Sequence, residues 1–200
     1  MIRYLVFIFL FLQGCTAASG DIFIILKDQI LGYSEPVIEL ADIEKSNYSF
    51  MTIKAGRGPY ARMILNTNKN GTYEWISSNN ERVYTFKGLV VRTVNLEHNF
   101  EIKDYASFDP LNPSVQSFKI NLDNPKLFDT VLTLKVTPTG EADIDRIHGP
   151  ILKYDLIKEI QSIGWKSRNT LWLTQNMDPI KSIQQTHPFY KKIQFNIYLK

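Results

Sequence analysis

Short alternating segments separated by close turns dominate residues 47–95, and they restrict the possible fold more than any other feature. Asn70-Gly71 and Lys87-Gly88 are two-residue hairpin signals, because such turns need a backbone with positive φ. Connections this short join antiparallel neighbours, since parallel strands need long crossovers. The pattern therefore predicts an antiparallel meander, whose strands are expected at residues 48–53, 60–66, 72–77, 82–86 and 89–95.

The second half of the chain has the same character. Asp109-Pro110 and Asn112-Pro113 place residues 107–114 in a loop. Further strands are expected at residues 116–122, 127–136, 152–161, 170–174, 180–186 and 191–198. Turns are expected at residues 123–125, 137–140, 162–164, 176–178 and 187–188. About a dozen short strands favour a barrel-like or strongly curved sheet, because closure removes exposed edges.

One or two short helices are expected before the strands. Residues 21–31 place apolar side chains near one face with Asp21 as the cap, although their Phe-Ile-Ile also suits a strand. Residues 34–41 read as the start of a second helix, because Pro36 is tolerated in a first turn. The predicted fold class is therefore mainly β, with antiparallel meanders and short N-terminal helices.

The first fifteen residues have the pattern of an export signal. Arg3 precedes the apolar run 4–12, which is shorter than the roughly 20 residues that a membrane-spanning helix needs. The ending Leu12-Gln13-Gly14-Cys15 resembles the lipobox of bacterial lipoproteins. That resemblance implies cleavage before Cys15 and lipidation of this residue. The alternative is an ordinary signal peptide with an incidental cysteine.

These signals divide the chain into a lipoprotein signal peptide at 1–14, a lipidated tether at 15–20 and a single β-rich domain at 21–200. Thr16 follows the cysteine at the position where an aspartate would favour retention in the inner membrane. By resemblance to that sorting rule, the expected location is the outer membrane, on its periplasmic face. The expected membrane partner is the outer membrane itself, reached through lipidated Cys15.

Composition narrows the classes of ligand. The formal net charge is +3, which is too weak to indicate nucleic-acid binding. Cys15 is the only cysteine, so no disulfide within the chain is expected. The histidines His98, His148 and His187 lie far apart in the sequence, and none has a partner at metal-ligand spacing. We therefore predict no metal and no cofactor.

Two groups of motifs carry a family resemblance. The first comprises Asn70-Gly71, the strand segment Trp75-Ile76-Ser77 and residues 88–96, which read Gly-Leu-Val-Val-Arg-Thr-Val-Asn-Leu. The second comprises residues 169–173, which read Asn-Thr-Leu-Trp-Leu, and residues 180–184, which read Ile-Lys-Ser-Ile-Gln. In this order, and behind a lipobox, they resemble the YjbF-like lipoprotein family, which includes the lipoprotein of the group 4 capsule operon. Asn79, Asn95 and Asp178 depart from the family pattern.

The resemblance implies a mostly β, barrel-like outer-membrane lipoprotein from operons that make or export capsule or biofilm exopolysaccharide. It implies partners among the polysaccharide-export or outer-membrane proteins of the same operon. It carries over no catalytic residue and no cofactor.

Three tryptophans suggest sugar stacking, because aromatic rings offer flat apolar faces to sugar rings. Trp75 and Trp172 lie within expected strands, where large aromatic residues usually fill the core. Trp165 lies beside the Gly164 turn, and we predict it as a glycan contact. Three acidic residues that lie close in sequence are better explained by a solvated loop than by a glycosidase pair: Glu141, Asp143 and Asp145.

The sequence thus predicts a lipid-anchored, non-enzymatic accessory protein for export or assembly of exopolysaccharide. Two alternatives remain open. The protein could be a carrier or chaperone that holds a lipid or glycan in a barrel cavity. It could also be a periplasmic glycan hydrolase.

Overall fold

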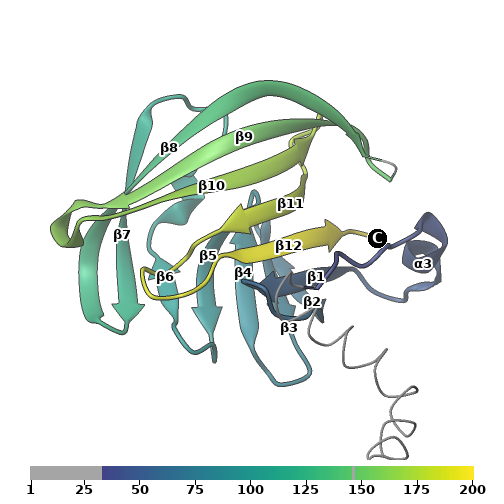
Figure 1. The fold of residues 1–200 in the computed structure, drawn as a ribbon, viewed down its shortest axis with the longest axis horizontal. Helices are drawn as coiled ribbons and strands as arrows, with labels where there is room; N and C mark the ends of the chain where they lie inside the picture. The colour runs from purple at the N-terminus through teal and green to yellow at the C-terminus, as the bar shows by residue number, and fades with distance from the viewer. Residues whose placement is uncertain (1–32, 146) are drawn as a thin grey trace, which may run out of the picture.

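A closed antiparallel β-barrel forms the body of the protein in a computed structural model that describes residues 33–145 and 147–200. The strands follow one another around the barrel in chain order, and β1 closes the ring against β12 (Figure 1). The described strands are β1 (Phe50–Ala55), β2 (Ala61–Lys69), β3 (Thr72–Ile76), β4 (Arg82–Phe86), β5 (Leu89–Val94), β6 (Phe100–Ile102), β7 (Val115–Asp123), β8 (Lys126–Asp145), β9 (Gly149–Ile160), β10 (Trp165–Thr174), β11 (Pro179–Gln184) and β12 (Ile193–Tyr198). The predicted fold class is confirmed.

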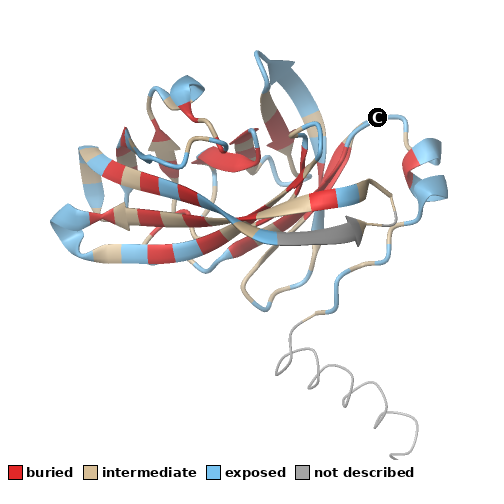
Figure 2. Ribbon diagram, turned by 90° about the horizontal axis from the view of Figure 1, so that it is seen from above, coloured by how far each residue is buried: buried red, intermediate tan, exposed pale blue. Residues whose placement is uncertain are grey.

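Alternation along the strands builds the core. In β10, the buried Leu171 and Leu173 flank the half-buried Trp172, as expected when successive side chains point to opposite faces of a sheet. Figure 2 shows the same banding of buried and exposed residues along the long strands. The largest interior side chains include Trp75, Met51 and Phe195, and all three are fully buried.

The β4–β5 hairpin fills part of the interior. Its Lys87-Gly88 turn has positive φ at both residues, as the Gly signal predicted. The hairpin reaches across the barrel, because buried Gln184 of β11 donates from Nε2 to the Gly88 carbonyl at 2.6 Å and accepts from the Val90 amide at 3.2 Å. Leu89 and Val90 are fully buried as a result.

The predicted second helix begins later than expected. Residues 34–39 are not helical, and the helix α3 spans Leu40–Lys45. The cause is Glu35, whose carboxylate accepts hydrogen bonds from Lys181, Gln194 and Asn196 on the outside of β11 and β12. This contact fastens the segment against the barrel and extends it. The helix predicted at residues 21–31 lies outside the described residues.

The predicted turn at residues 137–140 is wrong. β8 runs through Pro138 to Asp145 and pairs with β9, with a register shift between Pro138 and Ala142. Gly140 adopts φ of +75° there, so a bulge replaces the reversal. The acidic residues expected in a solvated loop therefore belong to the end of this strand.

Two short 3-10 helices, η2 (Tyr105–Ser107) and η3 (Gln161–Ile163), lie within the β6–β7 and β9–β10 connections. Residues 107–114 otherwise form the predicted loop. Strand β6 was not predicted, because it has only three residues and pairs with β5 through the single position Arg92–Glu101. Among the described residues, no helix is long and apolar enough to span a bilayer.

Candidate functional site

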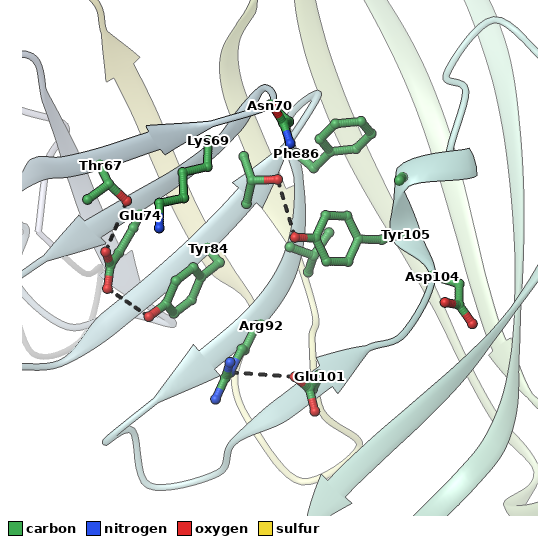
Figure 3. A pocket seen from close by; sticks show the side chains of 13 residues that line it. Thr67, Lys69, Asn70, Glu74, Tyr84, Phe86, Arg92, Glu101, Asp104 and Tyr105 are labelled. Carbon is green, nitrogen blue, oxygen red and sulfur yellow. Dashed lines mark hydrogen bonds and ion pairs between the residues drawn. The ribbon is translucent and has the colours of Figure 1, made fainter.

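A polar network centred on Glu74 covers the outer face of β2, β3 and β4. Trp75 points into the barrel, so the neighbouring Glu74 points outward. Its carboxylate accepts from the Tyr84 hydroxyl at 2.7 Å and from Arg82 Nη1 at 2.9 Å. Asn66 Nδ2 and Thr67 Oγ1 donate to its other oxygen at 2.9 and 3.1 Å. Figure 3 shows Glu74 held between β2 and β4.

These donors fix the protonation state of Glu74. The hydrogen bond from Tyr84 is the main cause that lowers the pKa of this carboxyl, and with the remaining donors it outweighs burial and brings the pKa to about 2. Glu74 therefore stays ionised at neutral pH. A glycosidase acid needs a raised pKa, so this carboxylate is unsuited to donate a proton to a sugar bond.

A hollow of about 430 Å³ lies beside this network. Aromatic side chains from two elements line it: Tyr84 and Phe86 of β4, and Tyr105 of η2 (Figure 3). The Phe86 and Tyr105 ring centroids are 5.6 Å apart, and the Thr72 hydroxyl donates to the Tyr105 hydroxyl at 3.3 Å. Lys69, Asp104 and Asn70 add charged and amide groups to the rim.

A second hollow of about 390 Å³ shares Arg92 and Glu101 with the first, so the two adjoin along the β5–β6 seam. Arg92 Nε lies 3.7 Å from Glu101 Oε1 between them. The second hollow is lined by Asn95 and Asn121, and by Phe128, whose residue is 71% exposed. We call the two hollows together the outer groove.

The outer groove combines the two kinds of group that bind carbohydrate. Exposed aromatic faces cover the apolar faces of sugar rings, and amide, carboxylate and guanidinium groups exchange hydrogen bonds with hydroxyls. The surface is hollowed between β5 and β6, because these strands pair at a single position, Arg92–Glu101. The arrangement offers an elongated binding surface rather than an enclosed pocket.

The three tryptophans lie in different environments. Trp75 is in the core as predicted, and its Nε1 donates to Thr85 Oγ1 at 2.9 Å. The core position predicted for Trp172 is wrong, because its side chain lies on the outer face, where Lys181 Nζ is 5.7 Å from its ring. Trp165 is half-buried against the main core and is not among the residues lining the outer groove. Its predicted glycan contact stays a prediction.

The other residues singled out in the sequence lie elsewhere. Cys15 is outside the described residues. Asp145 closes the β8–β9 turn by accepting from the backbone amides of Ile147 and His148, both at 2.8 Å. Glu141 and Asp143 belong to the same strand, β8.

Sequence reasoning missed the central residue of this surface. Glu74 and Tyr84 are directly paired across β3 and β4, and the turn at residues 78–80 lies between them. Counting outward from that turn would have placed the carboxylate opposite the phenol. No comparable signal existed for Phe128 or Tyr105, which reach the outer groove through tertiary packing.

The three histidines, which lie far apart in the sequence, fall into two separate places in the fold. His98 and His187 stack with ring centroids 4.8 Å apart, although they are far apart in sequence. His148 is separate from them and pairs with Asp145 at 2.8 Å.

Comparisons with known proteins place the chain in a family. The model of the family described as "Group 4 capsule polysaccharide lipoprotein gfcB, YjbF" matches residues 25–197. The crystal structure of the hypothetical lipoprotein YmcC from Escherichia coli (K12) is similar, with a TM-score of 0.64 and 15% sequence identity. The match covers 83% of this chain and 98% of that one, and it shows a shared fold. No curated protein matches the chain. The chain belongs to the group 4 capsule polysaccharide lipoprotein family.

Proposed function

We propose that this protein is a non-enzymatic accessory lipoprotein that binds an exopolysaccharide or capsule chain in its outer groove during export or assembly. The observation that carries the proposal is the pair of adjoining hollows, with aromatic side chains and ionised groups along the β5–β6 seam. A polymer needs an elongated, open surface, because its chain must enter and leave at both ends. The capsule polysaccharide family supplies the ligand class.

The packed interior argues against the carrier alternative. Trp75, Phe195 and the β4–β5 hairpin fill the barrel. The hollow bordered by Ile53, Met63 and Val83 has about 140 Å³. Ligand pockets usually measure about 300–1,000 Å³. A lipid therefore has less support as a ligand than a glycan on the outer face.

A lipid anchor would serve this function by confining the barrel to the membrane that the polysaccharide crosses. Lipidation of Cys15, with the barrel on the periplasmic face of the outer membrane, raises the effective concentration of the outer groove near an export protein of the same operon. The lipobox-like sequence at residues 12–15 supports this part of the proposal.

Replacing aromatic side chains tests the outer groove. The probe is the polysaccharide secreted by the cells that make the protein, immobilised and titrated with purified protein. We expect Phe128→Ala and Tyr105→Ala each to weaken binding about tenfold, because losing one stacked ring costs about 1–2 kcal/mol. Tyr48→Ala is the matched control, since Tyr48 is also exposed and is not among the residues lining the outer groove. Equal binding by all three variants would contradict the proposed site.

Removing the lipid attachment residue tests the anchor. A Cys15→Ser variant, exported by another signal, should fold and remain in the periplasm as a soluble protein. We expect secreted polysaccharide to fall toward the level of a gene deletion, because the outer groove is no longer held at the membrane. Full polysaccharide output from this soluble variant would show that anchoring is not the mechanism.

A further inference from the structure

Three segments that are distant in sequence meet at one end of the barrel. His98 lies in the β5–β6 connection, Asp123 ends β7 and His187 lies in the β11–β12 connection. Each offers one ligand atom, and these three atoms lie within 4.8 Å of one another. Asp123 also lines the second hollow of the outer groove, whereas the two histidines line neither hollow. The inference drawn here goes beyond the proposed function and does not depend on it.

Both histidines present buried nitrogen atoms that have no partner among the described residues. His187 is fully buried, and its Nε2 lies 4.0 Å from Asp123 Oδ1, which is beyond hydrogen-bond distance. His98 Nδ1 is likewise buried and without a hydrogen bond. Leaving such atoms unpaired costs about 1–3 kcal/mol each, so the grouping calls for a ligand.

The carboxylate is held in place for such a ligand. Asn99 donates to Asp123 Oδ2 twice, from its backbone amide at 2.8 Å and from its side-chain Nδ2 at 2.9 Å. Oδ1 remains directed toward His187. The same Asn99 side chain also exchanges hydrogen bonds with the backbone of Leu96, which braces the loop that carries His98. Outer partners of this kind orient the ligands of metal sites.

From this geometry we infer that His98, Asp123 and His187 bind a divalent transition-metal ion of the zinc type. Two imidazoles and one carboxylate are a ligand set that Zn²⁺ accepts, with a fourth position left for water. That position can face solvent, because the Asp123 side chain is 41% exposed. Zn²⁺ bonds of about 2.0–2.1 Å place tetrahedral ligand atoms about 3.3 Å apart. The three ligand atoms lie within 4.8 Å of one another, so they must close by up to about 1.5 Å.

Binding also moves one proton. His187 Nδ1 accepts from the Phe189 amide at 3.2 Å, which places the proton of the neutral ring on Nε2. Coordination through Nε2 transfers this proton to Nδ1 and opens the Phe189 contact. That contact is a single long hydrogen bond in a connecting turn, so its loss is small beside the energy of two new metal–nitrogen bonds.

Calorimetric titration with Zn²⁺ tests the inference on the full-length protein purified from the cells that make it. We expect one ion per chain and a rise in melting temperature with Zn²⁺ but not with Mg²⁺. His98→Gln and Asp123→Asn should each weaken Zn²⁺ binding by about tenfold or more. His148→Gln is the matched control and should bind as the wild type does, because His148 lies in a different turn. All variants keep Cys15, so any contribution from that residue is common to them.

Circular dichroism without metal checks that each variant is folded. Should His98→Gln fail this check, Asp123→Asn decides the question, since its amide still accepts from Asn99. The inference is overturned by an absence of Zn²⁺ binding, or by equal binding in the wild type, His98→Gln and Asp123→Asn. It is also overturned if His148→Gln is the variant that loses the ion.

Discussion

Lys158 is a basic residue that is almost completely buried. It lies in β9 with its side chain in the barrel interior, where Nζ donates to Gln184 Oε1 at 2.9 Å and lies 5.8 Å from the Phe100 ring. No carboxylate is paired with it among the described ion pairs. Burial therefore lowers the pKa of this amine to about 7.

The lowered pKa of Lys158 predicts how the unfolding free energy changes with pH. In the unfolded chain the lysine keeps its proton up to about its usual pKa of 10.5, whereas the folded protein releases it above about 7. The unfolded state binds more protons between these values, so stability should rise with pH across that range, by about 1.4 kcal/mol per pH unit. Below pH 7 both states are protonated, and the folded protein bears the full cost of a buried ammonium.

Lys158→Met removes this dependence while nearly preserving volume. We expect the variant to exceed the wild type in unfolding free energy most at pH 6, with the difference shrinking steadily between pH 7 and 9. Urea denaturation at each pH measures it. Lys135→Met, on the exposed face of β8, is the control and should show no such trend. A difference between Lys158→Met and wild type that does not change with pH would contradict the account.

At the scale of elements, the turn of the β4–β5 hairpin packs into the barrel interior. Gly88 has φ of +77°, and a Cβ there would collide with the Leu171 side chain and lie 2.9 Å from Pro179 Cβ. Gly71 has almost the same φ, +78°, but a Cβ there would meet only Phe86, at 3.6 Å. The two glycines therefore share a backbone requirement and differ in packing.

Alanine at each position separates these two effects. Gly71→Ala should lower the unfolding free energy by about 1 kcal/mol, through backbone strain alone. Gly88→Ala should lower the unfolding free energy by about 1–3 kcal/mol more than Gly71→Ala does, because the new methyl group overpacks the interior. Chemical denaturation of both variants gives the difference. Equal losses would show that the hairpin tip does not pack into the barrel as described.

Elements with local signals were predictable, and those that depend on neighbours were not. The Gly71 and Gly88 hairpins follow from two-residue turns whose φ requirement is local. Alternation would also have placed Trp172 outside, had Leu171 and Leu173 been recognised as the buried pair. Strand β6 has three residues, which is too short for a periodic pattern.

At the scale of the whole molecule, chain order around the barrel followed from short connections, whereas the sites did not follow from sequence. The stack of His98 on His187 and the sharing of Arg92 and Glu101 by two hollows both arise when the sheet closes. Sequence spacing contains no information about such contacts. The family match places the chain among the group 4 capsule polysaccharide lipoproteins, and the outer groove is the surface on which we propose that the polysaccharide binds.

Mapping polysaccharide contacts by nuclear magnetic resonance tests the central claim most directly. Isotope-labelled protein is titrated with oligosaccharides cut from the polysaccharide of the same cells, and shifts are assigned to residues. We expect the largest shifts along the outer groove, at Tyr84, Arg92, Tyr105 and Phe128, and none at Tyr48. Shifts confined to another face, or no shifts at saturating oligosaccharide, would contradict the claim that this barrel binds the polymer through its outer groove.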